Sequence, residues 1–175
     1  ILQYLEQTQP TAISTLQAIS TYSTSEFMVL DVSTRRNLEL SETIRRRDVE
    51  GSLLSILDKT MSPMGNRCMR QWVGKPLLDI DRINARLDIV NSFFQNPLLR
   101  AEFRARLHHI GDFERLANRL AGSVALPRDL SGIRAILQKL PEIKATLSEH
   151  ELNLEAKLAH FSLCTDALNL LETAI

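Results

Sequence analysis

Two arginine clusters are the residues of this sequence best suited to binding chemistry, namely Arg35, Arg36, Arg45, Arg46 and Arg47. Guanidinium groups bind phosphates and carboxylates through paired N–H donors, so the triplet at 45–47 is a candidate anion site and a weak candidate for nucleic-acid contact. The alternative is a solvated loop, because two acidic residues follow the triplet and binding tails usually carry blocks of about five or six like charges. Both interpretations remain open from the sequence.

Histidine and cysteine do not form a recognisable reactive site. His108 and His109 are adjacent, and adjacent helical side chains point about 100° apart, which is a poor geometry for sharing one metal ion. Cys68 and Cys164 each fall on an apolar helical face, which predicts core positions. The six glycines are scattered and form no phosphate-binding loop. The sequence therefore predicts no catalytic, cofactor-binding or metal-binding residue.

Composition limits the possible classes of protein. Hydrophobic residues make up 44% and charged residues 24%, which is typical of a globular chain and not of a disordered one. Lys plus Arg and Asp plus Glu are 21 each, whereas a dedicated nucleic-acid binder needs clustered cations to displace counterions from phosphates. No stretch approaches the roughly 18 apolar residues of a membrane span. Two unpaired cysteines indicate a reducing compartment.

Hydrophobic periodicity predicts a mostly α fold with a small β element near the N-terminus. Residues 27–30 end a stretch rich in β-branched and hydroxyl residues, which predicts a buried strand in a hairpin or edge pair. Asp31 is expected to cap a short helix, and a second short helix is expected over residues 52–58. Ser62 followed by Pro63 is a helix-start signal. The helix that it opens would place Met64, Cys68, Met69 and Trp72 along one face.

The second half of the sequence predicts a series of packed helices. Asp79 is expected to cap a helix whose apolar stripe is Ile83, Leu87, Val90 and Phe94. Further helices are expected to start at residues 97, 112 and 127, and Pro141 either kinks the last of these or begins a new one. A final helix from about residue 153 to 175 would be roughly 30 Å long at 1.5 Å per residue. The expected architecture is a multi-helical hub with a protruding long antiparallel helix pair.

Four motifs carry a resemblance to a known family. Residues 30–40 read LDVSTRRNLEL, residues 51–79 read GSLLSILDKTMSPMGNRCMRQWVGKPLLD, residues 112–116 read DFERL and residues 127–130 read PRDL. Together they resemble the core domain of the MutS family of DNA mismatch-repair proteins. Departures are small: cysteine at position 68, valine at position 73 and a looser loop at 123–126. The motif residues expected to be structural anchors are Asp31, Asn37, Pro63, Gly65, Trp72, Pro76, Asp79, Pro127 and Asp129.

The physical roles expected for these anchors are structural. The aspartates at positions 31 and 79 would start helices, Gly65 would permit a close helix approach, and Trp72 would fill the hub. The prolines would fix where helices begin and end. None of these residue types stands in a catalytic arrangement, so the chain is not expected to be an enzyme by itself.

What the resemblance implies is a connector. Residues 1–126 would form the core hub, and residues 127–175 would be lever helices leading toward a clamp domain missing from this sequence. Mismatched duplex DNA would be bound by other domains of the intact protein, and ATP and Mg²⁺ would be held in its ATPase domain. The intact protein would form a homodimer, work with other mismatch-repair proteins and reside in the bacterial cytoplasm. Levers of this kind couple distant sites by moving as rigid bodies.

Two other classes of function compete with a connector. An independent helical module could bind an amphipathic partner helix in a groove, although both ends of the sequence look cut from something longer. An all-α enzyme could bind an anionic metabolite through the arginine clusters, but it would need an acid or base beside them. A connector further predicts an exposed apolar stripe on the last helices, which would cause self-association or marginal stability.

Overall fold

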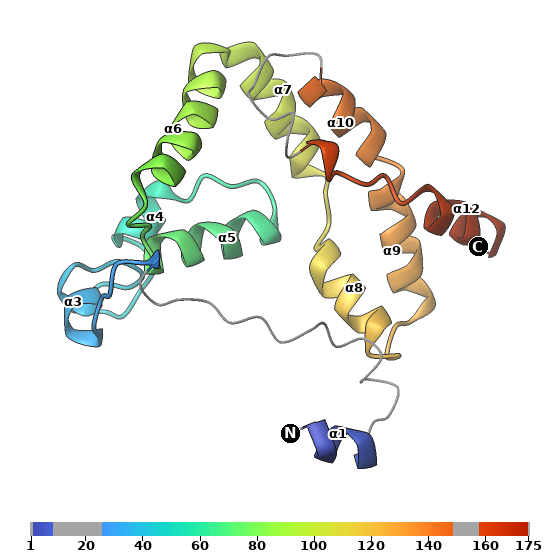
Figure 1. The fold of residues 1–175 in the computed structure, drawn as a ribbon, viewed down its shortest axis with the longest axis horizontal. Coiled ribbons are helices and arrows are strands. Elements are labelled where there is room, and N and C mark those ends of the chain that lie inside the picture. The colour runs from blue at the N-terminus through green and yellow to red at the C-terminus, as the bar shows by residue number, and fades with distance from the viewer. Residues whose placement is uncertain (1, 9–25, 149–157, 175) are drawn as a thin grey trace.

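The computed structural model describes residues 2–8, 26–148 and 158–174, and these residues are mostly helical, as the sequence predicts (Figure 1). The helices are α1 (Leu2–Thr8), α3 (Val32–Asn37), α4 (Leu53–Leu57), α5 (Pro63–Gly74), α6 (Ile80–Gln95), α7 (Pro97–His108), α8 (Phe113–Ala121), α9 (Pro127–Leu137), α10 (Leu140–Ser148) and α12 (Thr165–Ala174). No helix within the described residues is both long enough and apolar enough to cross a membrane.

Side-chain caps fix most helix starts. The carboxylate of Asp31 accepts the backbone N–H of Thr34, and Asp79 does the same for Arg82. The Ser62 hydroxyl accepts the N–H of Gly65 at the start of α5. These bonds satisfy donors that a first helical turn leaves unpaired. Proline then occupies the first position of α5, α7 and α9, where its missing N–H costs nothing.

The main core lies among the helices of the second half. Its buried side chains are Leu99, Ile110, Leu116, Ile133, Ile136, Leu137, Ile143 and Leu147. Helix α9 is central to this core, because it packs against α8, α10 and α12. In Figure 1 these helices and α7 form one side of an arch, and α3 to α6 form the other. We call these sides the C-terminal half and the N-terminal half.

The N-terminal half has buried side chains outside the main core. Leu40, Leu54 and Leu77 are buried there together with the hydroxyl residue Ser52. Ser52 is tolerated in the interior because its hydroxyl donates to the Val49 carbonyl and accepts the N–H of Ser55. In the GSLL motif, Ser52 is therefore both a helix cap and a buried residue, and Leu54 is the second buried residue.

The expected N-terminal hairpin is not what the described residues form. Phe27 makes an isolated antiparallel bridge to Leu77, in which the N–H of Met28 donates to the Pro76 carbonyl at 2.8 Å. The expectation of a buried strand over residues 27–30 was wrong, since Val29 is 83% exposed. A single bridge creates no sheet face that could cover it. Residues 19–25, which were expected to contribute to the hairpin, lie outside the described residues.

The apolar stripe expected on α6 is largely uncovered. Leu87, Val90 and Phe94 are each more than half exposed. The helix instead turns Phe93 toward the core, where its ring stacks on that of Phe103 with centroids 5.5 Å apart. The periodicity correctly predicted a helix, but the inward face was wrong by about one residue.

The expected single long helix at the C-terminus was also wrong. Residues 161–164 are not helical, and α12 begins only at Thr165. The break has a local cause: the Ser162 hydroxyl accepts the N–H of Cys164, whose φ is +50°, so the side chain competes with the helical ladder. Pro141 is the second residue of a separate helix, α10. No long antiparallel pair is therefore seen, and residues 153–157 lie outside the described part.

Three residues expected in the core are at the surface. Trp72 is 42% exposed, and the Arg86 guanidinium lies over its ring at 3.7 Å from the centroid. Cys68 is exposed as well, and so is Cys164. Trp72 and Cys68 are exposed because α5 turns Val73 toward a pocket that Leu40 and Leu54 also line, and Met64 toward the main core. The face containing Cys68 and Trp72 is left outside.

Candidate functional site

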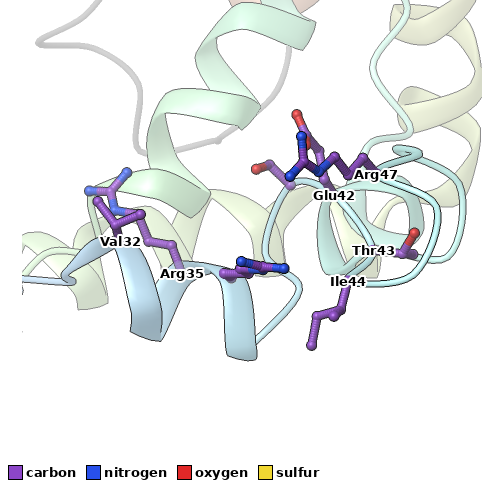
Figure 2. A pocket seen from close by; sticks show the side chains of 8 residues that line it. Val32, Arg35, Glu42, Thr43, Ile44 and Arg47 are labelled. Atoms are coloured by element: carbon purple, nitrogen blue, oxygen red, sulfur yellow. The ribbon is translucent and has the colours of Figure 1, made fainter.

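A basic pocket lies at the start of the N-terminal half (Figure 2). It has a volume of about 280 Å³. Helix α3 forms one wall, and the loop over residues 41–47 forms the other. The side chains that line it are Val32, Arg35, Arg36, Ser41, Glu42, Thr43, Ile44 and Arg47. We refer to it as the basic pocket.

Local hydrogen bonds determine the shape of the loop wall. The N–H of Thr43 donates to the Asp48 carbonyl, and the N–H of Arg47 donates to the Thr43 carbonyl. Glu39 accepts the N–H of Ile44 at 2.6 Å. Arg47 has a φ of +56°, a left-handed conformation uncommon outside glycine and asparagine. The tight turn thereby directs Arg47 into the same pocket as the α3 arginines.

The pocket carries unpaired polar groups. Within the described residues, Arg36 and Arg47 make no ion pair with a carboxylate, and Arg35 uses its Nε to bind the Leu30 carbonyl. The hydroxyl oxygen of Thr43 is buried without a hydrogen-bond partner in this part of the chain. A buried polar atom without a partner is uncommon and requires an explanation. Glu42 is the one acidic residue lining the pocket.

The pocket contains only part of the arginine set considered from sequence. Arg35, Arg36 and Arg47 line it, whereas Arg45 and Arg46 do not. Proximity in sequence was therefore a partial guide: the triplet is divided by the turn, and one member joins the other cluster. Thr43 was missed altogether, and no signal in the sequence marks its hydroxyl as buried.

A second arrangement of charges joins the two halves of the arch. The Arg67 guanidinium on α5 donates to both carboxylate oxygens of Asp112, at 3.0 and 2.7 Å. Its Nε and Nη2 also donate to Glu114, at 2.9 and 2.6 Å. We call this set the Arg67 junction. A paired arrangement of this kind fixes orientation as well as distance, because both groups are planar.

The electrostatics of the Arg67 junction favour the charged forms. Hydrogen bonds from Arg67, and then from the backbone N–H of Arg115, lower the pKa of Asp112 to about 2. The two carboxylates raise the pKa of Arg67 above its usual value. Asp112 also caps α8 by accepting the Arg115 N–H at 3.1 Å. One side chain therefore both starts a helix and binds the other half.

Further contacts cross the same boundary. Arg104 on α7 donates to the Lys59 carbonyl at 2.6 Å and contacts the Met61 sulfur at 3.0 Å. Met64 packs against the main core from α5. Asp58 holds the connecting loop by accepting the N–H and hydroxyl of Thr60, which lowers its pKa. These bonds give the LD-x-T part of the second motif a structural role.

Gly65 makes its close approach at a different place from the one expected, and Asp129 has two hydrogen-bond partners. A Cβ on Gly65 would lie 3.1 Å from the Thr60 Cβ, so the close approach is by the preceding turn rather than by another helix. Asp129, which is 5% exposed, accepts the Leu126 N–H and the Arg119 Nε, both at 2.9 Å. It thereby fixes the start of α9 and ties it to α8.

The remaining candidate residues form no reactive cluster. His108 and His109 lie edge to face, with centroids 5.2 Å apart. Among the described residues, no three His, Cys, Asp or Glu side chains are grouped so as to hold a metal ion. The motif residues Asn37 and Pro76 lie at the end of α3 and after α5, respectively.

Comparison with known proteins identifies the family. A family model for MutS domain III matches residues 33–175. The chain belongs to the MutS family. The DNA mismatch repair protein MutS of Alkaliphilus oremlandii (strain OhILAs) is 42% identical over 176 residues, which cover 100% of this chain and 20% of that protein. That of Lachnoclostridium phytofermentans is 45% identical over 151 residues, which cover 86% of this chain and 16% of that protein.

The match places both arrangements of charge within one MutS domain. The basic pocket and the Arg67 junction fall between residues 32 and 114, almost entirely inside the matched region. The chain spans about a fifth of the length of the curated MutS relatives that it matches over its whole length.

Proposed function

We propose that this chain is a non-catalytic structural and allosteric segment of a DNA mismatch-recognition ATPase, in which it links a DNA clamp to the ATPase domain. Residues 1–126 act as the hub, and residues 127–175 lead toward the clamp. Membership of the MutS family and the printed name of the relatives, DNA mismatch repair protein MutS, support this proposal.

The proposal assigns the chemistry to other parts of a longer protein. Mismatched duplex DNA is bound through other domains, and ATP and Mg²⁺ are held in the ATPase domain. The intact protein is a homodimer that works with other mismatch-repair proteins in the bacterial cytoplasm. In the described part of this chain, the carboxylates with lowered pKa values cap helices, hold a loop or form ion pairs.

The observation that carries the proposal is the Arg67 junction. A force applied to one half of the arch reaches the other through a side chain that makes four hydrogen bonds to two carboxylates. Such a contact resists rotation of α5 against the start of α8 better than a single hydrogen bond does. Rigid elements joined in this way are suited to transmitting a displacement between distant sites.

A chimera tests the proposal. This chain would replace the matching segment of the Alkaliphilus oremlandii protein, with and without Arg67→Gln. If the junction couples distant sites, the substitution leaves mismatch binding without nucleotide, and ATP hydrolysis without DNA, within about twofold. It reduces the ATP-induced change in DNA affinity by about fivefold or more, within the usual range of coupling energies. Stopped-flow fluorescence of labelled DNA would measure the change.

Arg82→Gln is the matched control. Arg82 forms an exposed ion pair with Glu26 at 2.9 Å, within the N-terminal half. Its loss should leave the ATP-induced change intact. The proposal is contradicted if both substitutions have the same effect, or if Arg67→Gln abolishes DNA binding and hydrolysis together while the chimera stays folded.

A further inference from the structure

The basic pocket contains donors that no group of the described chain uses. Arg36 and Arg47 lack a carboxylate partner there, and the buried Thr43 hydroxyl lacks any hydrogen-bond partner. The two guanidinium groups border a volume of about 280 Å³, whereas the Thr43 hydroxyl is covered by its own loop. Unused donors in a concave site are suited to an oxyanion, because charge-assisted bonds to guanidinium are the strong ones.

Apolar side chains border the same donors. Val32 is 82% exposed and Ile44 is 44% exposed, and both line the pocket. Figure 2 shows them extending from α3 on one side and from the loop on the other. Arginine beside exposed apolar groups is a composition enriched at protein–protein interfaces.

We infer that the basic pocket is a docking site for a protein segment that carries an acidic side chain beside an apolar one. The carboxylate accepts from Arg36 and Arg47, and the neighbouring apolar side chain covers Val32 and Ile44. Charge complementarity identifies the carboxylate: three arginines line the pocket against a single acid, Glu42. The site is independent of the Arg67 junction.

The observations favour a protein carboxylate over the nucleic-acid backbone. A duplex presents a series of phosphates and binds best to cations distributed along an open surface. This pocket is concave, and Glu42 would face a polyanion within it. Val32 and Ile44 would gain nothing from a phosphate. The formal net charge of the chain is zero, so there is no overall positive field to attract DNA.

An NMR titration of the 175-residue chain tests the inference, with acetyl-Leu-Asp-Leu-amide as the probe. We expect saturable shifts at Val32, Arg36, Thr43 and Arg47, with a dissociation constant in the millimolar range. The matching peptide with asparagine should bind about tenfold more weakly, the loss expected for charge-assisted hydrogen bonds. Arg36→Gln with Arg47→Gln should weaken binding of the aspartate peptide by a similar factor.

Arg45→Gln with Arg46→Gln is the matched control, because it removes the same charge from residues outside the pocket. It should leave the affinity within about twofold. Arg36→Gln alone, on α3 and outside the loop, should weaken binding by a few-fold and provides a second variant if the arginine pair disturbs the loop.

Four outcomes would overturn the inference. An equal loss of peptide affinity in the Arg45→Gln, Arg46→Gln control would mean that the peptide is attracted by diffuse positive charge. Saturable binding of inorganic phosphate at the same residues without binding of the peptide would mean a small-anion site. Pocket-dependent binding of a DNA duplex that the peptide does not compete for would mean a nucleic-acid contact. The absence of any saturable shift with the aspartate peptide would mean that no such docking site exists.

Discussion

At the scale of single residues, Asp112 has two structural roles. It caps α8 through the Arg115 N–H and binds Arg67 of the other half. Both roles require the carboxylate form, since each uses the oxygen atoms only as acceptors. Losing the charge therefore weakens a helix start and a contact between the halves at the same time.

This dual role predicts a dependence of stability on pH. The pKa of Asp112 is about 2, below the usual 3.8, chiefly because of the hydrogen bonds from Arg67. A lowered pKa in the folded state contributes stability above about pH 4, and this contribution is lost as the pH falls toward 2. Asp112→Asn should therefore lower the melting temperature at pH 7, and the difference from the unmodified chain should shrink toward pH 2.

Thermal melts followed by circular dichroism at pH 7, 4, 3 and 2 would measure the difference. Asp81→Asn, an exposed position in the first turn of α6, is the control and should show little change at any pH. A difference at Asp112 that stays constant down to pH 2 would contradict the assigned role.

Residue roles were predictable where the partner is near in sequence. Asp31, Ser62 and Asp79 each cap the helix that starts at the next residue. Each accepts the backbone N–H three residues ahead, and this spacing is visible in the sequence. Arg67 and Asp112 are 45 residues apart, and nothing in the sequence around either residue indicates that the other is its partner. Trp72 was misplaced because an aromatic side chain in a helical stripe can equally lie under a cation at the surface.

At the scale of helices, the contact between α8 and α9 is the most extensive in the described part of the chain. Gly132 on α9 allows it, because a Cβ there would lie 3.1 Å from the Leu116 Cδ1. Leu116 is 8% exposed and belongs to the main core, so its side chain has little room to move. The approach of these two helices also brings Arg119 within 2.9 Å of the Asp129 carboxylate.

Gly132→Ala should destabilise the chain. Alanine improves helix propensity by about 1 kcal/mol, but forcing a methyl group into a packed core costs about 1–3 kcal/mol. The expected net loss is about 1 kcal/mol in the free energy of unfolding, measured by urea denaturation. In a Leu116→Ala background the same substitution should become stabilising, because the crowded contact is gone. A stabilising effect in the unmodified chain would contradict the packing described.

Helix existence was easier to predict than helix faces. Proline, serine and aspartate positions located the starts of α5, α6 and α9 closely, because caps and missing donors act locally. The exposed face of α6 could not be predicted, since Leu87, Val90 and Phe94 have the period of a buried stripe. The break at residues 161–164 was missed because a side-chain hydrogen bond to Ser162 outweighs an otherwise helical apolar pattern.

At the scale of the whole molecule, the two halves meet where α6 packs against α7, through the stacked rings of Phe93 and Phe103, and through a few specific contacts elsewhere. The main core belongs to the C-terminal half, and Arg67, Arg104 and Met64 provide contacts across the boundary. Exposed apolar side chains occur on α6 and, at Leu170, on α12. An exposed stripe was expected on the last helices, and the more extensive one is on α6.

The motifs located the chain in its family without any of this geometry, because NLEL, GSLL and PRDL record local structural requirements. The local requirements met in these motifs are the helix cap at Asp31, the buried hydroxyl of Ser52 and the two hydrogen bonds that Asp129 accepts. The arrangement of the halves and the basic pocket depend on contacts between distant residues, so the sequence alone could not supply them.

The central claim is that this chain connects other domains and does not itself read the mismatch. Fluorescence-anisotropy titration of the chain with matched and mismatched duplexes, across a series of salt concentrations, tests it most directly. We predict weak binding or none, with the same affinity for both duplexes and a steep loss with salt where binding is seen. Tight binding with a clear preference for the mismatched duplex would contradict the claim and place a reading element within these 175 residues.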